Sequence, residues 1–182
     1  MTIMAPDATL VLGGARSGKS RTAEALARRR AGAGGTLVYV ATAEALDDEM
    51  AARIDAHRRQ RGAGWRTIDA PLEIAAAIAA QACPGRAVLV DCLTLWLSNL
   101  MHHGRDIGAE TDRLVAALAA ARGPVVLVAN EVGLGIVPDN AMARAFRDHA
   151  GRINQAVAAA AGQVLFVAAG LSLPLKGPGF SP

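Results

Sequence analysis

A glycine-rich octapeptide near the start of the chain has the residue types and spacing of an anion-binding loop. Residues 13–20 read GGARSGKS and match the pattern G-x4-G-K-[S/T]. Glycines let such a loop wrap closely around phosphate oxygens, so that backbone N–H groups point at the anion. In this pattern Lys19 reaches the β- and γ-phosphates, and Ser20 helps to hold Mg²⁺. The predicted phosphate-binding residues are therefore Gly13, Gly14, Ala15, Arg16, Ser17, Gly18, Lys19 and Ser20.

The hydrophobic pattern around this loop predicts the scaffold that holds it. Strand-like apolar runs lie at residues 9–12, 36–42, 87–91, 124–129 and 164–169, and residues 65–68 are a candidate for another short strand. Helical patterns alternate with them, at residues 19–30, 44–61, 71–82, 93–101, 106–122 and 139–161. Strands that are apolar throughout are typical of a mainly parallel sheet covered on both faces. We predict an α/β fold of the P-loop NTPase (RecA-like) type, with helices on both faces of the sheet.

The length of the chain and its last residues bear on domain organisation. Its 182 residues suit one compact domain, and no linker interrupts the alternation of strands and helices. Residues 174–182 contain three prolines and two glycines, a composition typical of irregular chain. We predict a single nucleotide-binding domain over residues 1–182, in which residues 174–182 form a loose tail.

An aspartate at the end of an apolar run is a candidate metal ligand. Asp91 follows the apolar residues 87–90, where a Walker B acid supports Mg²⁺ in P-loop enzymes. Strand ends also carry aspartates that cap the next helix, so this position alone allows either role. The Asn-Lys-x-Asp sequence that reads guanine in regulatory GTPases is absent, and these motifs leave the choice between ATP and GTP open.

A histidine in the second predicted helix is a candidate nucleophile. Glu49, Arg53, His57 and Arg61 are spaced by four and therefore share one helical face. Positive charge on both sides disfavours the imidazolium form, which leaves a neutral, nucleophilic ring near physiological pH. The same arginines could neutralise a phosphate under attack. Before any resemblance is considered, the pattern favours a surface histidine on a basic amphipathic helix.

Composition excludes several functional classes. Only 3% of the residues are aromatic and the formal net charge is +3, which disfavours a nucleic-acid-binding protein. No apolar run reaches membrane-spanning length, so we expect no stable membrane insertion. Two cysteines, Cys83 and Cys92, are too few for a disulfide framework, and the N-terminus lacks the pattern of a signal peptide. We expect a cytoplasmic protein.

Several phrases, in order along almost the full chain, resemble one known family, the bifunctional adenosylcobinamide kinase/adenosylcobinamide-phosphate guanylyltransferases of cobalamin biosynthesis. The phosphate loop is generic, but the combination is highly specific. The phrases are GGARSGKS (13–20), LDDEMAARI (46–54), HRRQRGAGWRT (57–67), VDCLTLWLSN (90–99), NEVGLGIVP (130–138) and RDHAGRINQ (147–155).

The resemblance implies two reactions. His57 falls at the position of the family's covalently guanylylated histidine, which takes GMP from GTP and passes it to adenosylcobinamide phosphate. In the kinase reaction, the loop containing Lys19 presents a γ-phosphate of ATP or GTP, with Mg²⁺, to the hydroxyl of adenosylcobinamide. The resemblance also implies a homo-oligomer, a trimer. It further implies nucleotide contacts at Ala41, Thr42, Ala43, Arg58, Arg59, Gln60, Arg61, Asp69 and Asp91.

Two departures from the family pattern and two alternatives accompany this interpretation. Gly62 stands where the family commonly has proline, and Asp69 stands where it commonly has glutamate. Some relatives transfer GMP without acting as kinases, and the sequence does not decide between the two kinds. The alternatives are a P-loop small-molecule kinase without covalent histidine chemistry and a RecA-like ATPase acting on a macromolecule.

Overall fold

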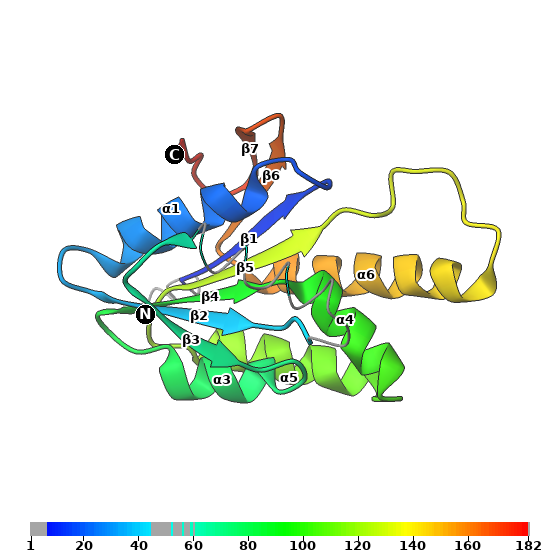
Figure 1. Ribbon diagram of the computed structural model, residues 1–182, viewed down its shortest axis with the longest axis horizontal. Helices are drawn as coiled ribbons and strands as arrows, with labels where there is room; N and C mark the ends of the chain where they lie inside the picture. Colours follow the sequence, from blue (N-terminus) through cyan, green and yellow to red (C-terminus); the bar gives the residue numbers. More distant parts are fainter. Residues whose placement is uncertain (1–6, 45–51, 53–55, 57–58, 60, 182) are drawn as a thin grey trace.

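A seven-stranded sheet forms the centre of the molecule (Figure 1). The computed structural model describes residues 7–44, 52, 56, 59 and 61–181. In spatial order the strands are β3 (Trp65–Asp69), β2 (Thr36–Ala41), β4 (Arg86–Asp91), β5 (Val125–Asn130), β1 (Ala8–Gly13), β6 (Gln163–Ala168) and β7 (Leu171–Lys176). β1 to β6 are parallel, and β7 runs antiparallel to β6 at one edge. The predicted α/β fold class with a mainly parallel sheet is confirmed.

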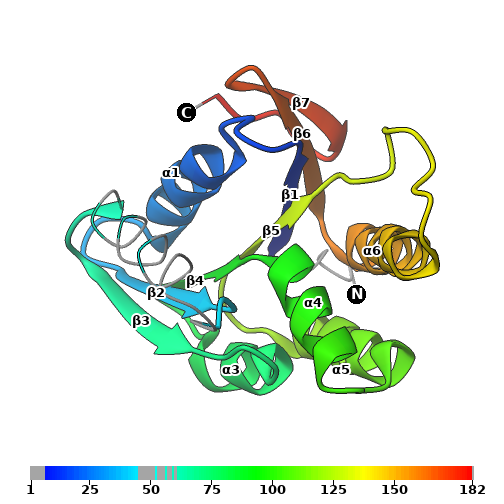
Figure 2. The same cartoon turned by 45° about the vertical axis from the view of Figure 1, so that its right-hand side comes forward.

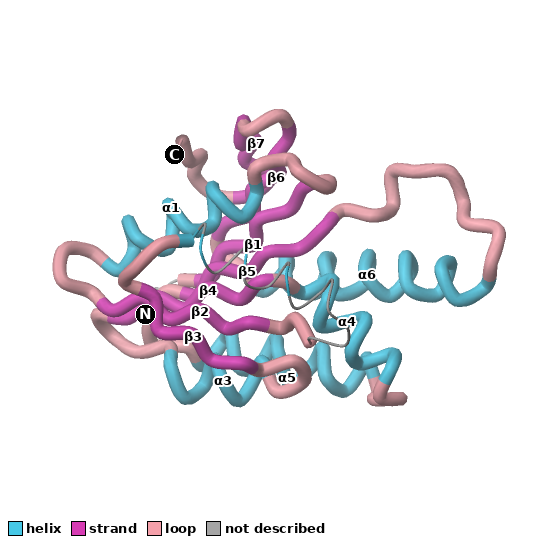
Figure 3. The backbone as a smooth tube through the Cα atoms, viewed as in Figure 1, coloured by secondary structure: helices cyan, strands magenta, loops and turns pink. Residues whose placement is uncertain are grey.

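Helices cover both faces of the sheet (Figures 1 and 2). One face is covered by α1 (Lys19–Ala31), and the other by α3 (Ile74–Gln81), α4 (Leu93–His102), α5 (Ile107–Ala120) and α6 (Ala141–Ala160). The central strands are buried on both faces, which explains why they are apolar without alternation. Coloured by secondary structure, the two helical layers stand clearly on opposite sides of the strands (Figure 3).

The α3 helix begins later than the sequence pattern predicts. A first-turn proline predicted a helix from Pro71, but α3 starts at Ile74. The carbonyl oxygen of Pro71 accepts a hydrogen bond from Asn99 Nδ2 at 3.0 Å, and that of Leu72 accepts one from Trp96 Nε1 at 2.8 Å. Because these two carbonyl oxygens accept hydrogen bonds from side chains of α4, they do not begin the backbone hydrogen bonds of α3.

The end of the chain is more ordered than the predicted loose tail. Residues 171–176 form β7, and Pro174 is accommodated because β7 is an edge strand. Beyond the strand, Gln163 Nε2 donates to the carbonyl oxygen of Pro178, and Ser172 Oγ donates to that of Phe180. Phe180 packs beside the core on the α1 face. The sequence pattern missed this strand because its apolar residues are interrupted by serine and proline.

In the described part of the chain, no helix has both the length and the apolar composition needed to span a bilayer.

Candidate functional site

The carboxyl ends of the parallel strands bring the candidate residues to one edge of the sheet. Gly13, at the end of β1, lies beside Asn130 of β5, and Ala41, at the end of β2, lies beside Asp91 of β4. Because β5 separates β1 from β4, these two strands lie about 10 Å apart. Ligands of open α/β sheets bind at this edge.

The predicted phosphate loop lies between the end of β1 and the start of α1. Gly18 caps the start of α1 with a φ of 97°, and Arg16 has a φ of 55°. Lys19 Nζ donates a hydrogen bond of 3.1 Å to the carbonyl oxygen of Gly14, which folds the lysine back across the loop. The backbone N–H groups at the start of the 13-residue helix α1 provide the positive end of its dipole.

Close packing inside the loop explains one of its glycines. A Cβ atom at Gly13 would lie 2.4 Å from the carbonyl oxygen of Val167 and 2.5 Å from Ser17 Oγ. Ser17 Oγ is itself buried and has no hydrogen-bond partner among the described residues. A buried hydroxyl without a partner costs free energy, so an anion bound in the loop could supply the missing contact.

Asp91 is hydrogen-bonded by a tyrosine that belongs to no sequence motif. The hydroxyl of Tyr39, in β2, donates a hydrogen bond of 3.0 Å to Asp91 Oδ2. Burial, together with the charge of Asp91, raises the pKa of this hydroxyl well above its usual value, so that it stays protonated. The N-cap of α4 is Cys92, with no side-chain capping bond. Asp91 is therefore not the N-cap residue of α4; it is the last residue of β4.

The side chain of Thr42 is engaged within the protein. Its Oγ1 donates to the carbonyl oxygen of Cys92 at 2.9 Å and accepts from the Cys92 N–H at 2.8 Å. The Thr42 carbonyl oxygen accepts from Asn99 Nδ2 at 2.7 Å. These contacts join the ends of β2 and β4 to α4. Thr42 is fully buried, whereas the neighbouring Ala43 is partly exposed. Any nucleotide contact of this segment would therefore come from its neighbours or its backbone.

The remaining candidates fall into three groups. His57, Arg58 and Gln60 lie outside the described residues. Arg59 is exposed, and Asp69 is exposed at the end of β3, where it pairs in register with Ala41 at the same sheet edge. Arg61, by contrast, is buried, with its guanidinium carbon 3.4 Å from the ring centroid of Tyr39.

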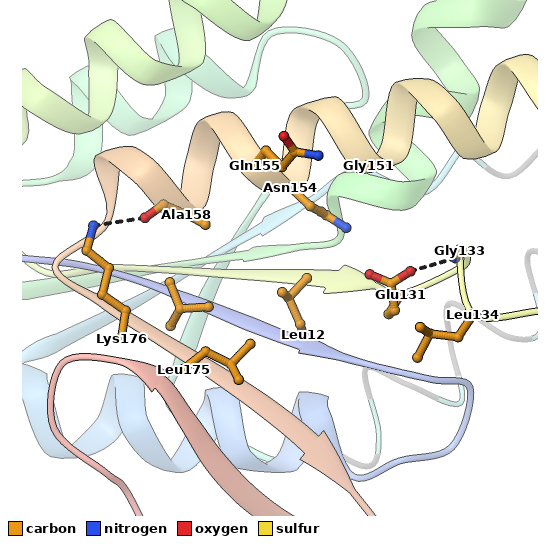
Figure 4. A pocket seen from close by; sticks show the side chains of 11 residues that line it. Leu12, Glu131, Gly133, Leu134, Gly151, Asn154, Gln155, Ala158, Leu175 and Lys176 are labelled. Carbon is orange, nitrogen blue, oxygen red and sulfur yellow. Dashed lines mark hydrogen bonds between the residues drawn. The ribbon is translucent and has the colours of Figure 1, made fainter.

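A cavity of about 490 Å³ lies on the opposite face of β1 from α1 (Figure 4). Leu12, Leu134, Val164 and Leu175 are among the residues that line it. The α6 helix forms one wall. Lys176 Nζ bonds to the carbonyl oxygens of Ala158 and Ala159 at the end of α6. The sequence pattern gave no signal for this cavity, because it depends on β7.

Comparison with known proteins assigns the family. A family model described as cobinamide kinase / cobinamide phosphate guanyltransferase matches residues 9–175. The chain belongs to this family. It is therefore a member of an enzyme family of cobalamin biosynthesis, as its sequence phrases indicated.

Curated members of the cobinamide kinase/guanyltransferase family match over nearly their whole length. A bifunctional adenosylcobalamin biosynthesis protein of Pseudomonas aeruginosa, CobP, is 48% identical over 170 residues, covering 92% of this chain and 96% of its own. The bifunctional adenosylcobalamin biosynthesis protein CobU of Escherichia coli is 44% identical over 182 residues, covering 92% of this chain and 98% of its own. A CobU of Salmonella typhimurium matches to the same extent.

Proposed function

We propose that this protein transfers GMP from GTP to adenosylcobinamide phosphate through a covalent histidine intermediate, and that it also phosphorylates adenosylcobinamide. The observation that carries this proposal is the phosphate loop, whose Lys19 lies folded across it, in a chain that matches the family over residues 9–175. His57 is the proposed nucleophile because the resemblance assigns that position to it. The structural description does not include His57, so this role rests on the sequence.

The proposed guanylyl transfer has two balanced steps. An imidazole nitrogen of His57 attacks the α-phosphorus of GTP, a P–N bond forms, and the P–O bond to the β-phosphate breaks. Pyrophosphate leaves with the electron pair of that bond. A phosphate oxygen of adenosylcobinamide phosphate then attacks the same phosphorus and the P–N bond breaks, which restores the histidine. Splitting one transfer into two displacements is nucleophilic catalysis and gives ping-pong kinetics.

In the proposed kinase reaction, positioning and charge stabilisation provide most of the catalysis. The substrate hydroxyl attacks the γ-phosphorus in line with the departing nucleoside diphosphate, the P–O bond to the β-phosphate breaks, and the hydroxyl proton passes to water. Lys19 would stabilise the charge on the transferred group, and the N–H groups of the loop would hold the β-phosphate. ATP and GTP both remain donors in this proposal, because the loop contacts only phosphates.

Ser20 and Asp91 are the residues that we propose to hold Mg²⁺. A hydroxyl and a carboxylate are hard oxygen donors of the kind that Mg²⁺ prefers when nucleotide phosphates complete its coordination. Both lie at the carboxyl edge of the sheet, and Asp91 is not the N-cap residue of α4. When bound, the metal would neutralise phosphate charge; the chain's own task is to hold the two oxygens in place.

We also propose that the protein works as a homo-oligomer, a trimer by resemblance. Exposed apolar side chains gather on β7, at Leu171, Leu173 and Leu175, and on the loop after β5, which includes Leu134 and Ile136. This loop extends beyond the sheet (Figure 1), and Leu134 and Leu175 both line the cavity of Figure 4. Large exposed apolar patches mark association surfaces, which supports this proposal.

Covalent labelling tests the proposed chemistry. The protein is incubated with GTP that is radiolabelled at the α-phosphate, denatured and separated by size. We expect label that is stable in alkali, lost in acid and absent from the His57→Ala variant. Label on His57→Ala, or no label on the wild-type chain, would remove the guanylyltransferase proposal. Transfer of γ-phosphate that survives in His57→Ala without release of pyrophosphate would instead indicate an ordinary P-loop kinase.

A further inference from the structure

Tyr39 stands between two residues of the proposed site. Its hydroxyl donates to Asp91 Oδ2 at 3.0 Å, and its ring face lies 3.4 Å from the guanidinium carbon of Arg61. We propose that Tyr39 is a positioning residue: its hydroxyl orients the Asp91 carboxylate for the metal, and its ring anchors the chain that follows His57. The metal role of Asp91 belongs to the proposed function, so this inference rests on it.

The first of these two contacts, the hydrogen bond from the Tyr39 hydroxyl to Asp91, is called the hydroxyl arm here, and its tyrosine is buried. Tyr39 is 5% exposed and its ring packs edge-on against Trp65, with centroids 6.0 Å apart. A ring enclosed in this way holds its hydroxyl in one place, and the hydrogen bond to a carboxylate oxygen then restricts rotation of that carboxylate. Restriction of this kind matters for Mg²⁺, which demands near-ideal octahedral geometry. Outer hydrogen bonds to ligating carboxylates commonly change metal affinity tenfold or more.

The second contact, between the Tyr39 ring and the Arg61 guanidinium, is called the ring arm here. It gives Arg61 a role different from the nucleotide contact that the resemblance implies. The Arg61 side chain is 6% exposed and stacks on Tyr39, an arrangement in which the ring face attracts the cation. Its carbonyl oxygen accepts a hydrogen bond of 3.2 Å from Arg28 Nη2, and the Arg28 guanidinium lies 5.3 Å from the Trp65 ring centroid. Both the side chain and the backbone of Arg61 are thus fixed to the α1 face of the sheet.

Arg61 therefore serves as an anchor. It lies four positions after His57 in the sequence, and Gly62, which follows it, has a φ of 75°. Arg61 is thus a fixed point of the backbone four positions from the proposed nucleophile in the sequence. The same tyrosine thus connects the proposed metal carboxylate to the segment that carries the proposed nucleophile.

The Tyr39→Phe variant tests the hydroxyl arm, because it removes one oxygen and keeps the ring under Arg61. We expect the Mg²⁺ concentration for half-maximal GTP labelling to rise roughly tenfold, with a smaller fall in the maximal rate. Binding of Mn²⁺ in the presence of a non-hydrolysable GTP analogue, measured by electron paramagnetic resonance, should weaken by a similar factor. Unchanged metal dependence in both measurements overturns the proposal.

A matched control separates metal positioning from loss of a buried hydrogen bond. Thr9 is fully buried in β1, and its hydroxyl donates to Gln163 Oε1 at 3.0 Å. It lies near the start of β1, away from the carboxyl edge of the sheet. Thr9→Val should lower the melting temperature without moving the metal dependence. An equal shift of metal dependence in Thr9→Val would mean that general loosening of the fold explains the Tyr39→Phe result.

Arg61→Met and Arg61→Lys test the ring arm. Arg61→Met keeps the apolar stem without its charge, and we expect the rate of covalent labelling at saturating GTP to fall about tenfold, more than the kinase rate falls. Arg61→Lys, which retains a cation over the ring, should recover part of the loss. A rise in the KM for GTP at unchanged maximal rate would identify Arg61 as a nucleotide contact and overturn the anchor.

A single tyrosine in the chain gives a readout independent of activity. Fluorotyrosine incorporated in place of Tyr39 provides one ¹⁹F resonance, which should shift when Mg²⁺ and a GTP analogue bind together and stay in place in the Asp91→Asn variant. If the chemical shift of this resonance does not change on metal binding, the proposal that the Tyr39 hydroxyl orients Asp91 is wrong. If the wild-type chain takes no covalent label but this resonance responds, the histidine chemistry fails and the positioning role of Tyr39 stands.

Discussion

The amide of Gly170 donates a hydrogen bond of 2.8 Å to the carbonyl oxygen of Ser17, so the turn between β6 and β7 supports the phosphate loop. The two segments are more than 150 positions apart in the sequence. A Cβ atom at Gly18 would lie 3.2 Å from Gly170 Cα, which shows how closely they pack. The shape of the loop therefore depends on the edge of the sheet as well as on its own glycines.

Gly170→Ala should weaken nucleotide binding through this support. Gly170 has a φ of 79°, a conformation that costs an alanine about 1 kcal/mol. Gly85→Ala is the matched control, since Gly85 has a φ of 76°, has open space around it and lies before β4. We expect both variants to lose similar thermal stability, and only Gly170→Ala to bind GTP several-fold more weakly by calorimetry. Equal GTP affinity in the two variants would contradict the coupling.

Gly13→Ala should be strongly destabilising even without nucleotide. The added methyl group would meet the Val167 carbonyl oxygen at 2.4 Å, and overpacking of this kind typically costs about 1–3 kcal/mol. Gly14→Ala changes the neighbouring position, where no atom lies within 4 Å, and should leave the free energy of unfolding nearly unchanged. Urea denaturation of the nucleotide-free proteins measures both. A similar loss in the two variants would show that loop entropy, and not the close contact, sets the cost.

Thr42→Val should destabilise the junction of β2 and β4. Valine keeps the shape of the side chain but leaves the buried N–H of Cys92 without the hydroxyl that accepts from it. An unsatisfied buried donor costs about 1–3 kcal/mol, so the unfolding free energy should fall by that amount. Thr42→Ser keeps the hydroxyl and should lose less. Equal losses for serine and valine would assign the effect to packing of the methyl group.

Stability of the metal-free protein should fall at alkaline pH. Burial, assisted by the nearby Asp91 charge, raises the pKa of the Cys92 thiol to about 11. Between pH 8 and 10.5 the unfolded chain loses this proton while the folded chain keeps it, so the free energy of unfolding falls, by on the order of 2 kcal/mol. The Cys92→Ala variant should show a smaller fall. Urea denaturation in EDTA at the two pH values checks this, with Cys83→Ala as the control that keeps the full effect.

A charge on β7 should disrupt self-association. Leu173 is 59% exposed in the single chain, and burying a glutamate there without a partner is costly. We expect Leu173→Glu to elute as a species near the 18.7 kDa chain mass, and the wild type as a multiple of it, by light scattering after gel filtration. Thr67→Glu places the same charge on exposed β3 at the opposite edge. Dissociation by Thr67→Glu and not by Leu173→Glu would move the interface to that edge.

The sequence predicted β1, β2, β4, β5 and β6 because these strands are apolar on both faces. It predicted the order of strand, glycine-rich loop and helix around residues 13–20 because that motif is local. It did not predict that Tyr39 would meet Asp91. Fifty-two positions separate these residues, and only the pairing of β2 with β4 brings them together. The engagement of Thr42 with Asn99 likewise follows from packing of α4. The sequence also did not predict that Arg61 is buried, because its burial depends on an aromatic pair on two other strands.

The position of β1 also has a consequence for the protein's synthesis. Its neighbours are β5 and β6, which the ribosome makes more than 100 residues after the loop that β1 carries. A nascent chain with the complete GGARSGKS octapeptide but no β6 has neither the Val167 carbonyl nor the Gly170 amide against which the octapeptide packs. Affinity for nucleotide should therefore emerge only after Val167 and Gly170 have been translated, which makes GTP binding a reporter of that stage of synthesis.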